Sequence, residues 1–176
     1  MTIYFSSDYH LGHFNIIQYC NRPFQDVEEM DATIIENHNN IVKKDDTFIH
    51  IGDFCWHDKF EEYRKQLQGN IIFLSGNHDD LANNYPYIER LYMYILGKHI
   101  HLVHDPENYD LGMLNLVGHV HQVWVYNRFK LYNQIVECIN VGVDRWQFMP
   151  ISFLEILDLQ KSILKKLDKR STSYME

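Results

Sequence analysis

The stretch Ile71-Ile-Phe-Leu-Ser-Gly-Asn-His-Asp79 decides how this chain folds. Its first four residues form a short apolar, β-prone run, which Ser75 and Gly76 bring to an end. Two residue types that bind metals or move protons, Asn77 and His78, follow at once. Open α/β folds place their sites in this position, beyond the carboxyl ends of the strands. The stretch therefore predicts a strand that delivers polar side chains to one edge of a sheet.

Four other segments repeat this order of an apolar run followed by residue types that bind metals. Taken alone, each has an ordinary alternative, such as a helix cap, a turn or a surface histidine. Five such segments in series would bring carboxylate, amide and imidazole groups together at one edge of a sheet. That convergence predicts a two-metal catalytic centre. The candidates are Asp8 and His10 after residues 3–5, Asp53 after residues 47–52, His104 after residues 100–103, and His119 and His121 after residues 114–118.

Helix start signals lie between several of these runs. Three capping boxes pair an Asp or Ser with a Glu three residues later, and apolar residues follow each pair at helical spacing. Alternating strands and helices predict an α/β protein. No internal repeat, low-complexity tract or flexible linker interrupts residues 1–176, which we expect to form a single domain. The pairs are Asp26 with Glu29, Asp58 with Glu61, and Ser152 with Glu155.

The charge of the chain argues against a long nucleic acid as partner. A formal net charge of −8 opposes a broad surface for polyanions, because non-specific nucleic-acid binding depends on clustered Lys and Arg. The one basic cluster, at residues 161–170, is interpreted as the solvated face of a final helix. A nucleic-acid tail is the alternative interpretation of that cluster.

Cysteine usage and hydropathy indicate a soluble, cytoplasmic protein. Cys20, Cys55 and Cys138 are odd in number and show no Cys-x-x-Cys spacing, which predicts reduced thiols. The first residues have neither the basic start nor the apolar length of a signal peptide. No apolar run approaches the ~20 residues needed to cross a bilayer, so we expect no membrane partner.

Three histidines lie within predicted strands rather than after them. His50 is flanked by apolar residues, and we expect it to be a hydrogen-bonded core residue rather than a ligand. His99 and His101 share one strand face, and we expect both at the surface.

With these segments in place, the sequence resembles the calcineurin-like metallophosphoesterase superfamily. Gly76-Asn-His-Asp79 and Gly118-His-Val-His121 match its two most specific signatures, and the five segments follow its order over residues 3–121. The resemblance implies a four-layer αββα sandwich with two packed mixed β-sheets. It also implies two divalent ions bridged by Asp53. One ion would have Asp8, His10, Asp53 and His121 as ligands, and the other Asp53, Asn77, His104 and His119.

The chain also resembles a compact branch of small bacterial and phage phosphoesterases. The resemblance rests on Gly12-His-Phe-Asn15, Cys20-Asn-Arg-Pro-Phe24 and Asn140-Val-Gly-Val-Asp144. His13, Asn15 and Arg22 are candidate substrate contacts, since Arg offers a planar donor fork for phosphate. Their alternatives are a surface ion pair for Arg22, a helix cap for Asn15, and a hydrogen-bond donor behind a metal ligand for His13.

These residues suggest hydrolysis of a phosphodiester or phosphomonoester in a small, nucleotide-like substrate, with a diester favoured. The hypothesis is attack by metal-activated hydroxide, with His78 protonating the leaving group. Manganese is the expected ion, and iron, zinc, nickel, cobalt and magnesium are alternatives. Many relatives carry an Asp three residues after the bridging one to orient the catalytic histidine, but this chain has Trp56 there. Asp79 or Asp58 is the candidate replacement.

Two other classes of function compete with the enzyme. A non-catalytic metal-binding interaction module on the same fold tends to lose ligands or the catalytic histidine, whereas this chain keeps all eight residues. A nuclease subunit acting on long DNA would need a basic groove or an added domain, and neither is visible in the sequence. The natural substrate, the metal and the oligomeric state stay open at this point.

Overall fold

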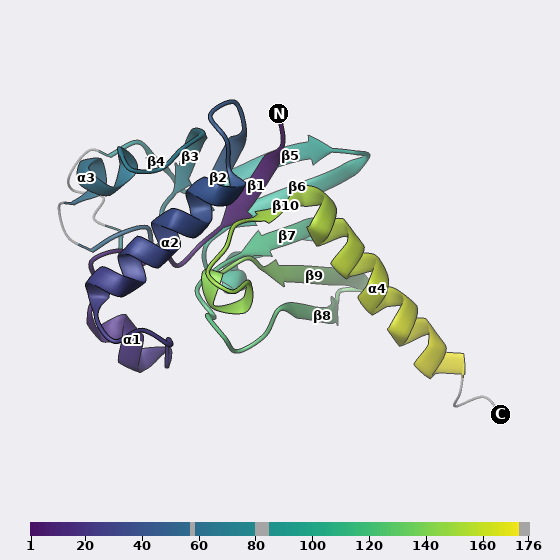
Figure 1. Cartoon of the computed structure of the whole chain (residues 1–176). Coiled ribbons are helices and arrows are strands. Elements are labelled where there is room, and N and C mark those ends of the chain that lie inside the picture. Colours follow the sequence, from purple (N-terminus) through teal and green to yellow (C-terminus); the bar gives the residue numbers. More distant parts are fainter. Residues whose placement is uncertain (57–58, 80–84, 173–176) are drawn as a thin grey trace.

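Two five-stranded mixed sheets form the centre of the protein in the computed structural model, which describes residues 1–56, 59–79 and 85–172 (Figure 1). The strand order is β10-β1-β2-β3-β4 in the first sheet and β5-β6-β7-β9-β8 in the second. The first sheet comprises β1 (Ile3–Ser6), β2 (Thr47–Ile51), β3 (Asn70–Leu74), β4 (Tyr87–Ile88) and β10 (Ile151–Ser152). The second comprises β5 (Arg90–Ile95), β6 (Lys98–Val103), β7 (Leu114–Val117), β8 (Tyr126–Leu131) and β9 (Gln134–Asn140).

The strands that matter for function run parallel. β1, β2, β3 and β4 run parallel to one another, and so do β6, β7 and β9. β10, β5 and β8 are antiparallel at the edges. The predicted α/β class with two packed mixed sheets is confirmed. Parallel pairing places the carboxyl ends of the central strands of each sheet at one edge, as the sequence requires.

Alternating side chains of both sheets fill the space between them. Phe5, Ile49 and Leu74 from the first sheet and Ile100 and Leu116 from the second are fully buried in one apolar cluster. Full burial of each such side chain stabilises the fold by about 1.5–3 kcal/mol. This shared core holds the two strand-end edges in a fixed relation to each other.

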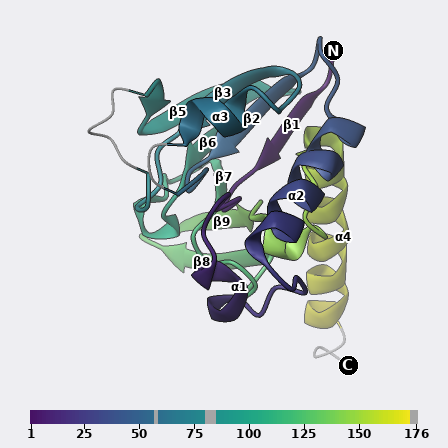
Figure 2. The same cartoon turned by 60° about the vertical axis from the view of Figure 1, so that its left-hand side comes forward.

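The four α-helices of the described residues lie in two groups around the sheets. In Figure 1 α1 (Asn15–Tyr19), α2 (Val27–Ile41) and α3 (Phe60–Arg64) lie to the left, and α4 (Phe153–Thr172) lies to the right. In the turned view of Figure 2, β8 and β9 of the second sheet lie below β2 and β3 of the first. α4 packs its first turn, with Phe153, Ile156 and Leu157, into the core between the sheets.

One predicted capping box is confirmed in full, and a second is confirmed for its N-cap bond alone, because Glu29 accepts from the Gln25 N–H and not from Asp26. Asp26 accepts a hydrogen bond from the Glu29 backbone at 2.8 Å and starts α2. Ser152 and Glu155 bond reciprocally at the start of α4. The third predicted cap, Asp58, lies outside the described residues, and α3 begins at Phe60.

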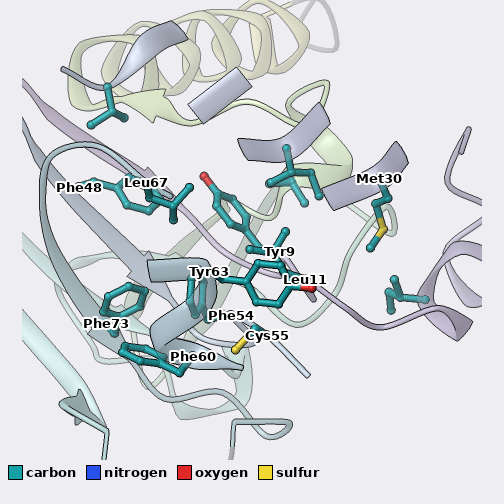
Figure 3. Packing of buried hydrophobic residues seen from close by; sticks show 14 of the residues in the cluster. Tyr9, Leu11, Met30, Phe48, Phe54, Cys55, Phe60, Tyr63, Leu67 and Phe73 are labelled. Atoms are coloured by element: carbon teal, nitrogen blue, oxygen red, sulfur yellow. The ribbon is translucent and has the colours of Figure 1, made fainter. Parts of the chain in front are cut away.

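Aromatic side chains join the first sheet to helices α1, α2 and α3 (Figure 3). Phe54 packs between Phe60 and Phe73, with ring centroids 5.4 and 4.7 Å away. His50 belongs to the same cluster of rings, edge-on to Tyr9 at 4.7 Å. The core position predicted for His50 is confirmed, but its hydrogen bond is not. Among the described residues neither of its ring nitrogens has a hydrogen-bond partner, because its surroundings are aromatic.

One surface prediction is wrong. His99 is exposed as expected, but His101 is fully buried. The Tyr92 ring stacks on it at 4.8 Å, and its Nδ1 lies 3.0 Å from Asn115 Oδ1. Tyr92 of the neighbouring strand β5 thus covers a side chain of β6 that the sequence alone predicts to be exposed.

Two further findings concern the cysteines and the helices. All three cysteines are buried and unpaired. None of the described helices has the length and apolar character needed to cross a membrane.

His38 on α2 makes stability depend on pH. Its Nε2 donates to the Gln68 carbonyl at 2.9 Å, so Nδ1 is left to accept from the Tyr9 hydroxyl at 3.1 Å. Burial lowers the pKa of His38 from 6.5 to about 4. As the pH falls from about 6.5 to about 4, His38 therefore binds a proton in the unfolded chain but not in the folded chain.

We expect the free energy of unfolding to fall by about 3 kcal/mol over that window on account of His38 alone. The His38→Gln variant, whose amide keeps both kinds of bond and does not titrate, should show a correspondingly flatter profile. Urea unfolding at pH 7 and pH 4 in chelator-containing buffer measures this. His99→Gln at an exposed position is the control. Equal slopes in the wild type and His38→Gln would contradict the prediction.

Candidate metal centre

The predicted ligands meet where the central strands of both sheets end. Asp8, Asp53 and Asn77 follow β1, β2 and β3, while His104 and His119 follow β6 and β7. The two sheets are joined here, since the His119 backbone N–H donates to Asp8 Oδ1 at 3.0 Å. Within the first sheet, the Asp8 N–H donates to the Gly52 carbonyl at 3.0 Å. The site therefore lies across the end of the sandwich and draws on both sheets.

Several of these residues have backbone conformations that side chains rarely adopt. A non-glycine residue held with positive φ costs on the order of 1–3 kcal/mol and persists only where its surroundings enforce it. Such strain clusters at functional sites because it aims side chains in directions that regular structure does not allow. The residues are Asp8 (58°), His10 (51°), Asp53 (58°), His119 (69°) and His121 (45°).

Asp53 lies at the middle of the cluster. Its Oδ2 is 3.4 Å from His10 Nε2 and 3.3 Å from His104 Nε2. Its other oxygen accepts from the His78 backbone N–H at 2.9 Å. The carboxylate is 1% exposed. One oxygen therefore faces an imidazole of each predicted ligand group, which is the position a bridging ligand requires.

The first ligand group has the geometry of a cation site. The ligand atoms of Asp8, His10 and His121 all lie within 4.8 Å of one another. His10 Nε2 is buried and has no hydrogen-bond partner among the described residues. Leaving a buried polar nitrogen without a hydrogen bond costs about 1–3 kcal/mol. The position of this nitrogen near the carboxylates of Asp8 and Asp53 therefore needs an explanation. A divalent cation between these groups fits, because imidazole and carboxylate are ligands for transition ions.

The second group adds an amide oxygen. Asp8, Asp53 and His104 also have ligand atoms within 4.8 Å of one another. Asn77 Oδ1 lies 3.2 Å from His104 Nε2 and 2.9 Å from His119 Nδ1. The structure thus brings together all seven residues predicted as ligands. The two groups of three overlap at Asp8, and Asp53 Oδ2 lies near an imidazole of each. A mixed shell of oxygen and nitrogen suits manganese, iron or zinc.

Hydrogen bonds behind two of the imidazoles turn the correct nitrogen toward the centre. His104 Nδ1 donates to the Ile51 carbonyl at 2.8 Å, and His121 Nδ1 donates to Asp144 Oδ2 at 2.8 Å. A proton held on Nδ1 leaves Nε2 as the ligand atom. Burial alone would lower the pKa of His104, but Asp53 and Asp8 raise it to about 9. The carboxylates therefore favour a positive charge at this position.

Two glycines allow the closest approaches in the site. A Cβ on Gly76 would collide with the carboxylate and the backbone nitrogen of Asp53. A Cβ on Gly118 would collide with Ser7 Oγ and would meet Asp8 Oδ2 at 2.8 Å. Both glycines of the two signature segments are thus required by packing around the carboxylates.

His78 lies beside the cluster and outside both ligand groups. Its ring centroid is 5.4 Å from that of His10 and 6.0 Å from that of Trp56, and the residue is exposed. Its backbone bond to Asp53 fixes where the side chain starts. The position is open to a substrate, and the catalytic role of His78 stays a prediction.

Asp79 does not have the role proposed for it. Its carboxylate accepts from the backbone N–H groups of Asp53 at 2.7 Å and Phe54 at 3.0 Å, and from Gly76 and the Tyr87 hydroxyl. It holds the end of β2 against the loop after β3 and is not free to orient His78. The other candidate, Asp58, lies outside the described residues.

One of the three predicted substrate contacts is contradicted by the structure. The Arg22 side chain is 0% exposed, and its guanidinium bonds to Asp144 and to two backbone carbonyls, so its donors are not free for a phosphate. Asn15 is exposed at the first position of α1, and the residue before that helix makes no side-chain cap bond. His13 stacks on Trp56 at 4.0 Å. The substrate roles of Asn15 and His13 stay predictions.

Three residues around the ligands were missed in the sequence. Ser7 Oγ donates to Asp8 Oδ2 at 2.5 Å. The Asn140 amide donates to the His121 carbonyl at 2.7 Å, and Asp144 accepts from the His121 ring. The segment Asn140-Val-Gly-Val-Asp144 could have pointed to two of them. It contributed to the resemblance to small phosphoesterases, but no role was predicted for its residues.

Comparison with known proteins agrees with this geometry. Residues 1–150 match the family model of the calcineurin-like phosphoesterases. An uncharacterized protein of Methanocaldococcus jannaschii, MJ1445, is 35% identical over 173 residues, which cover 93% of this chain and 92% of that protein. The structure of AQ665 from Aquifex aeolicus, a protein of unknown function, has 30% identity and a TM-score of 0.70, covering 90% of this chain and 98% of that one.

A more distant structure is that of the phosphoesterase Yfce from E. coli, with 16% identity and a TM-score of 0.44, covering 80% of this chain and 78% of that one. The matched residues 1–150 include every predicted metal ligand and His78. The chain therefore belongs to the calcineurin-like phosphoesterase family.

Proposed function

We propose that this protein is a two-metal phosphoesterase that hydrolyses a small, nucleotide-like phosphoester, with a diester favoured over a monoester. Its family comprises hydrolases that act on phosphoester bonds and bind divalent metals. The observation that carries the proposal is the position of Asp53 Oδ2, 3.4 Å from His10 Nε2 and 3.3 Å from His104 Nε2. One carboxylate oxygen between two imidazoles supports a bridged pair of ions, of which manganese is the proposed identity.

The chain itself would hold the ions and orient the substrate. When bound, the two ions supply a hydroxide nucleophile at neutral pH and Lewis-acid stabilisation of phosphoryl oxygens. Asp8, His10 and His121 hold one side of the centre, and Asn77, His104 and His119 hold the other. His78 stands at the exposed side, where its imidazole would donate a proton to the leaving oxygen.

Aromatic side chains near His78 support a planar group on the substrate. Trp56 stacks on His13 with an interplanar angle of 5°, and His78 lies near both rings. Tyr19 on α1, which is 71% exposed, extends this aromatic region, since its ring centroid is 6.3 Å from that of His13. Aromatic faces of this kind attract other planar rings. A nucleobase or aryl group on the leaving side of the phosphorus suits this arrangement.

The proposal is tested by an activity panel of metals and substrates on purified protein. Metal-free protein is reloaded with Mn, Fe, Zn, Ni, Co or Mg and assayed on aryl phosphomonoesters, aryl phosphodiesters, alkyl phosphodiesters and cyclic nucleotides. We expect two bound ions per chain, turnover of diesters above monoesters, and complete loss with chelator. The Asp53→Asn variant, purified in the same way, controls for contaminating hydrolases. Two bound ions without turnover of any substrate would instead support a metal-binding interaction module.

A further inference from the structure

Two charged residues outside the predicted ligand set form a buried pair against the metal centre. Arg22 lies after α1, and Asp144 lies in the short 3-10 helix Val143–Arg145, far along the chain. Their side chains are 0% and 3% exposed. Arg22 Nε donates to Asp144 Oδ1 at 2.8 Å, and Nη2 donates to Oδ2 at 2.9 Å. This two-pronged contact fixes both side chains in one plane.

Asp144 also holds a metal ligand. Its Oδ2 accepts from His121 Nδ1 at 2.8 Å. A carboxylate can only accept here, so it keeps the ring proton on Nδ1 and leaves Nε2 for a cation. The backbone of the same ligand is held separately, because the Asn140 amide donates to the His121 carbonyl at 2.7 Å. His121 is therefore oriented before any ion binds.

Arg22 holds the opposite side of the same ion position. Nη2 donates to the Asp8 carbonyl at 2.7 Å, and Nη1 donates to the Tyr9 carbonyl at 3.0 Å. These carbonyls belong to the turn in which Asp8 and His10 have positive φ values of 58° and 51°. A strained turn needs such contacts to persist. One guanidinium thus connects the turn carrying two ligands to the carboxylate that orients a third.

We infer that Arg22 and Asp144 are a positioning pair for one of the two ions, the one held by Asp8, His10 and His121. The inference rests on the proposed function and extends it, because it makes the two ion positions unequal. The other position depends on His104, whose Nδ1 is held by the backbone carbonyl of Ile51. The pair acts through the ligands and does not contact the substrate.

Asp144→Asn is the most informative variant. Asparagine keeps the shape of the side chain, but its NH₂ group can donate to His121 Nδ1 and move the ring proton to Nε2, which blocks the ligand atom. We expect one of two Mn²⁺ ions to bind about 10- to 100-fold more weakly, while the other is unchanged. Calorimetric titration of metal-free protein measures both affinities, and ¹⁵N NMR reports which nitrogen of His121 carries the proton. Asp144→Glu, which restores the acceptor, should recover part of the loss.

The control is Glu137→Gln on β9. This carboxylate is bonded to Tyr126 and Gln160 and contacts no predicted ligand, so both affinities should stay at the wild-type value. Removing a buried charge can also unfold the chain, because the opposite charge is left unpaired. If Asp144→Asn does not fold, Arg22→Lys, which keeps the positive charge but cannot form the fork, is titrated instead with the same expectation.

The outcomes separate the inference from the proposed function. A folded Asp144→Asn protein with two wild-type affinities and the proton still on His121 Nδ1 overturns the positioning pair and leaves the two-metal proposal intact. Equal weakening of both ions also overturns it, because the pair would then have only a general structural role. Wild-type protein that fails to bind two ions overturns the proposed function itself.

Discussion

Replacing Asp53 by asparagine is expected to lower turnover by at least about 10³-fold and to reduce the bound ions from two to one. The carboxylate faces His10 and His104 with the same oxygen. An amide has one oxygen and carries no charge. If that oxygen keeps the hydrogen bond from the His78 N–H, the NH₂ group takes the place of Oδ2 and faces both imidazoles. A catalytic ion supplies several kcal/mol of transition-state stabilisation, about 4 kcal/mol being equivalent to 10³-fold at about 1.4 kcal/mol per tenfold.

The metal content after dialysis and the turnover number measure the effect of Asp53→Asn. Glu137→Gln makes the same chemical change at a carboxylate in the middle of β9. It should leave the metal content and the turnover number unchanged. Circular dichroism verifies that each variant is folded. If Asp53→Asn kept two ions and near-normal turnover, Asp53 would not be the bridge.

His78→Ala is expected to keep both ions and to lose about 10²- to 10⁴-fold in turnover, the usual contribution of a positioned proton donor. Only the backbone N–H of His78 bonds to Asp53, and alanine keeps that bond. The ring contributes neither to the group of Asp8, His10 and His121 nor to that of Asp8, Asp53 and His104. The loss should therefore appear in turnover and not in metal affinity.

Leaving groups of different acidity make this prediction specific. An alkoxide needs a proton as it departs, whereas an aryl oxide with a low pKa does not. The loss in His78→Ala should accordingly be large for alkyl esters and small for activated aryl esters of the same phosphate. His99→Ala, at an exposed position of β6, is the control. An equal loss for all leaving groups would assign His78 to substrate binding rather than to proton transfer.

The surroundings of His78 bear on how it works. Trp56 stands three residues after Asp53, where it cannot orient His78 as an aspartate would. The Asp79 carboxylate already accepts hydrogen bonds from backbone N–H groups. Among the described contacts, His78 is instead bordered by the rings of His10, Trp56 and His13. Ring packing in place of a carboxylate restricts the imidazole without adding negative charge.

Much of the fold could be predicted from short stretches of sequence. β2 and β3 coincide with apolar runs that end at Gly52 and at Ser75 and Gly76. The ligand side chains follow those ends directly, and the parallel pairing of these strands brings them to one edge. β5 and β8 were not predicted, because they alternate exposed and half-buried residues at the edges of the second sheet and carry no continuous apolar run.

The errors concern residues whose partners are not their immediate neighbours in the sequence. Arg22 has the chemistry of a phosphate contact, yet a carboxylate 122 residues later and two carbonyls use all of its nitrogens. His101 belongs to a face that looks polar until Tyr92 covers it. Asp144 comes after β9, in the segment Asn140-Val-Gly-Val-Asp144, for which the sequence alone predicted no chemistry. In each case the partner, and not the residue type, decides the role.

The sequence by itself determined which residues end the strands and in what order metal-binding types follow them, because strand, turn and cap preferences act over a few residues. Only the tertiary structure decided that Asp53 Oδ2 faces both His10 and His104, and that Arg22 is tied to Asp144 rather than to a substrate. The physical reason is that hydrogen bonds and ion pairs act over about 3 Å. They form between groups that only the packing of the two sheets and their connecting segments brings together.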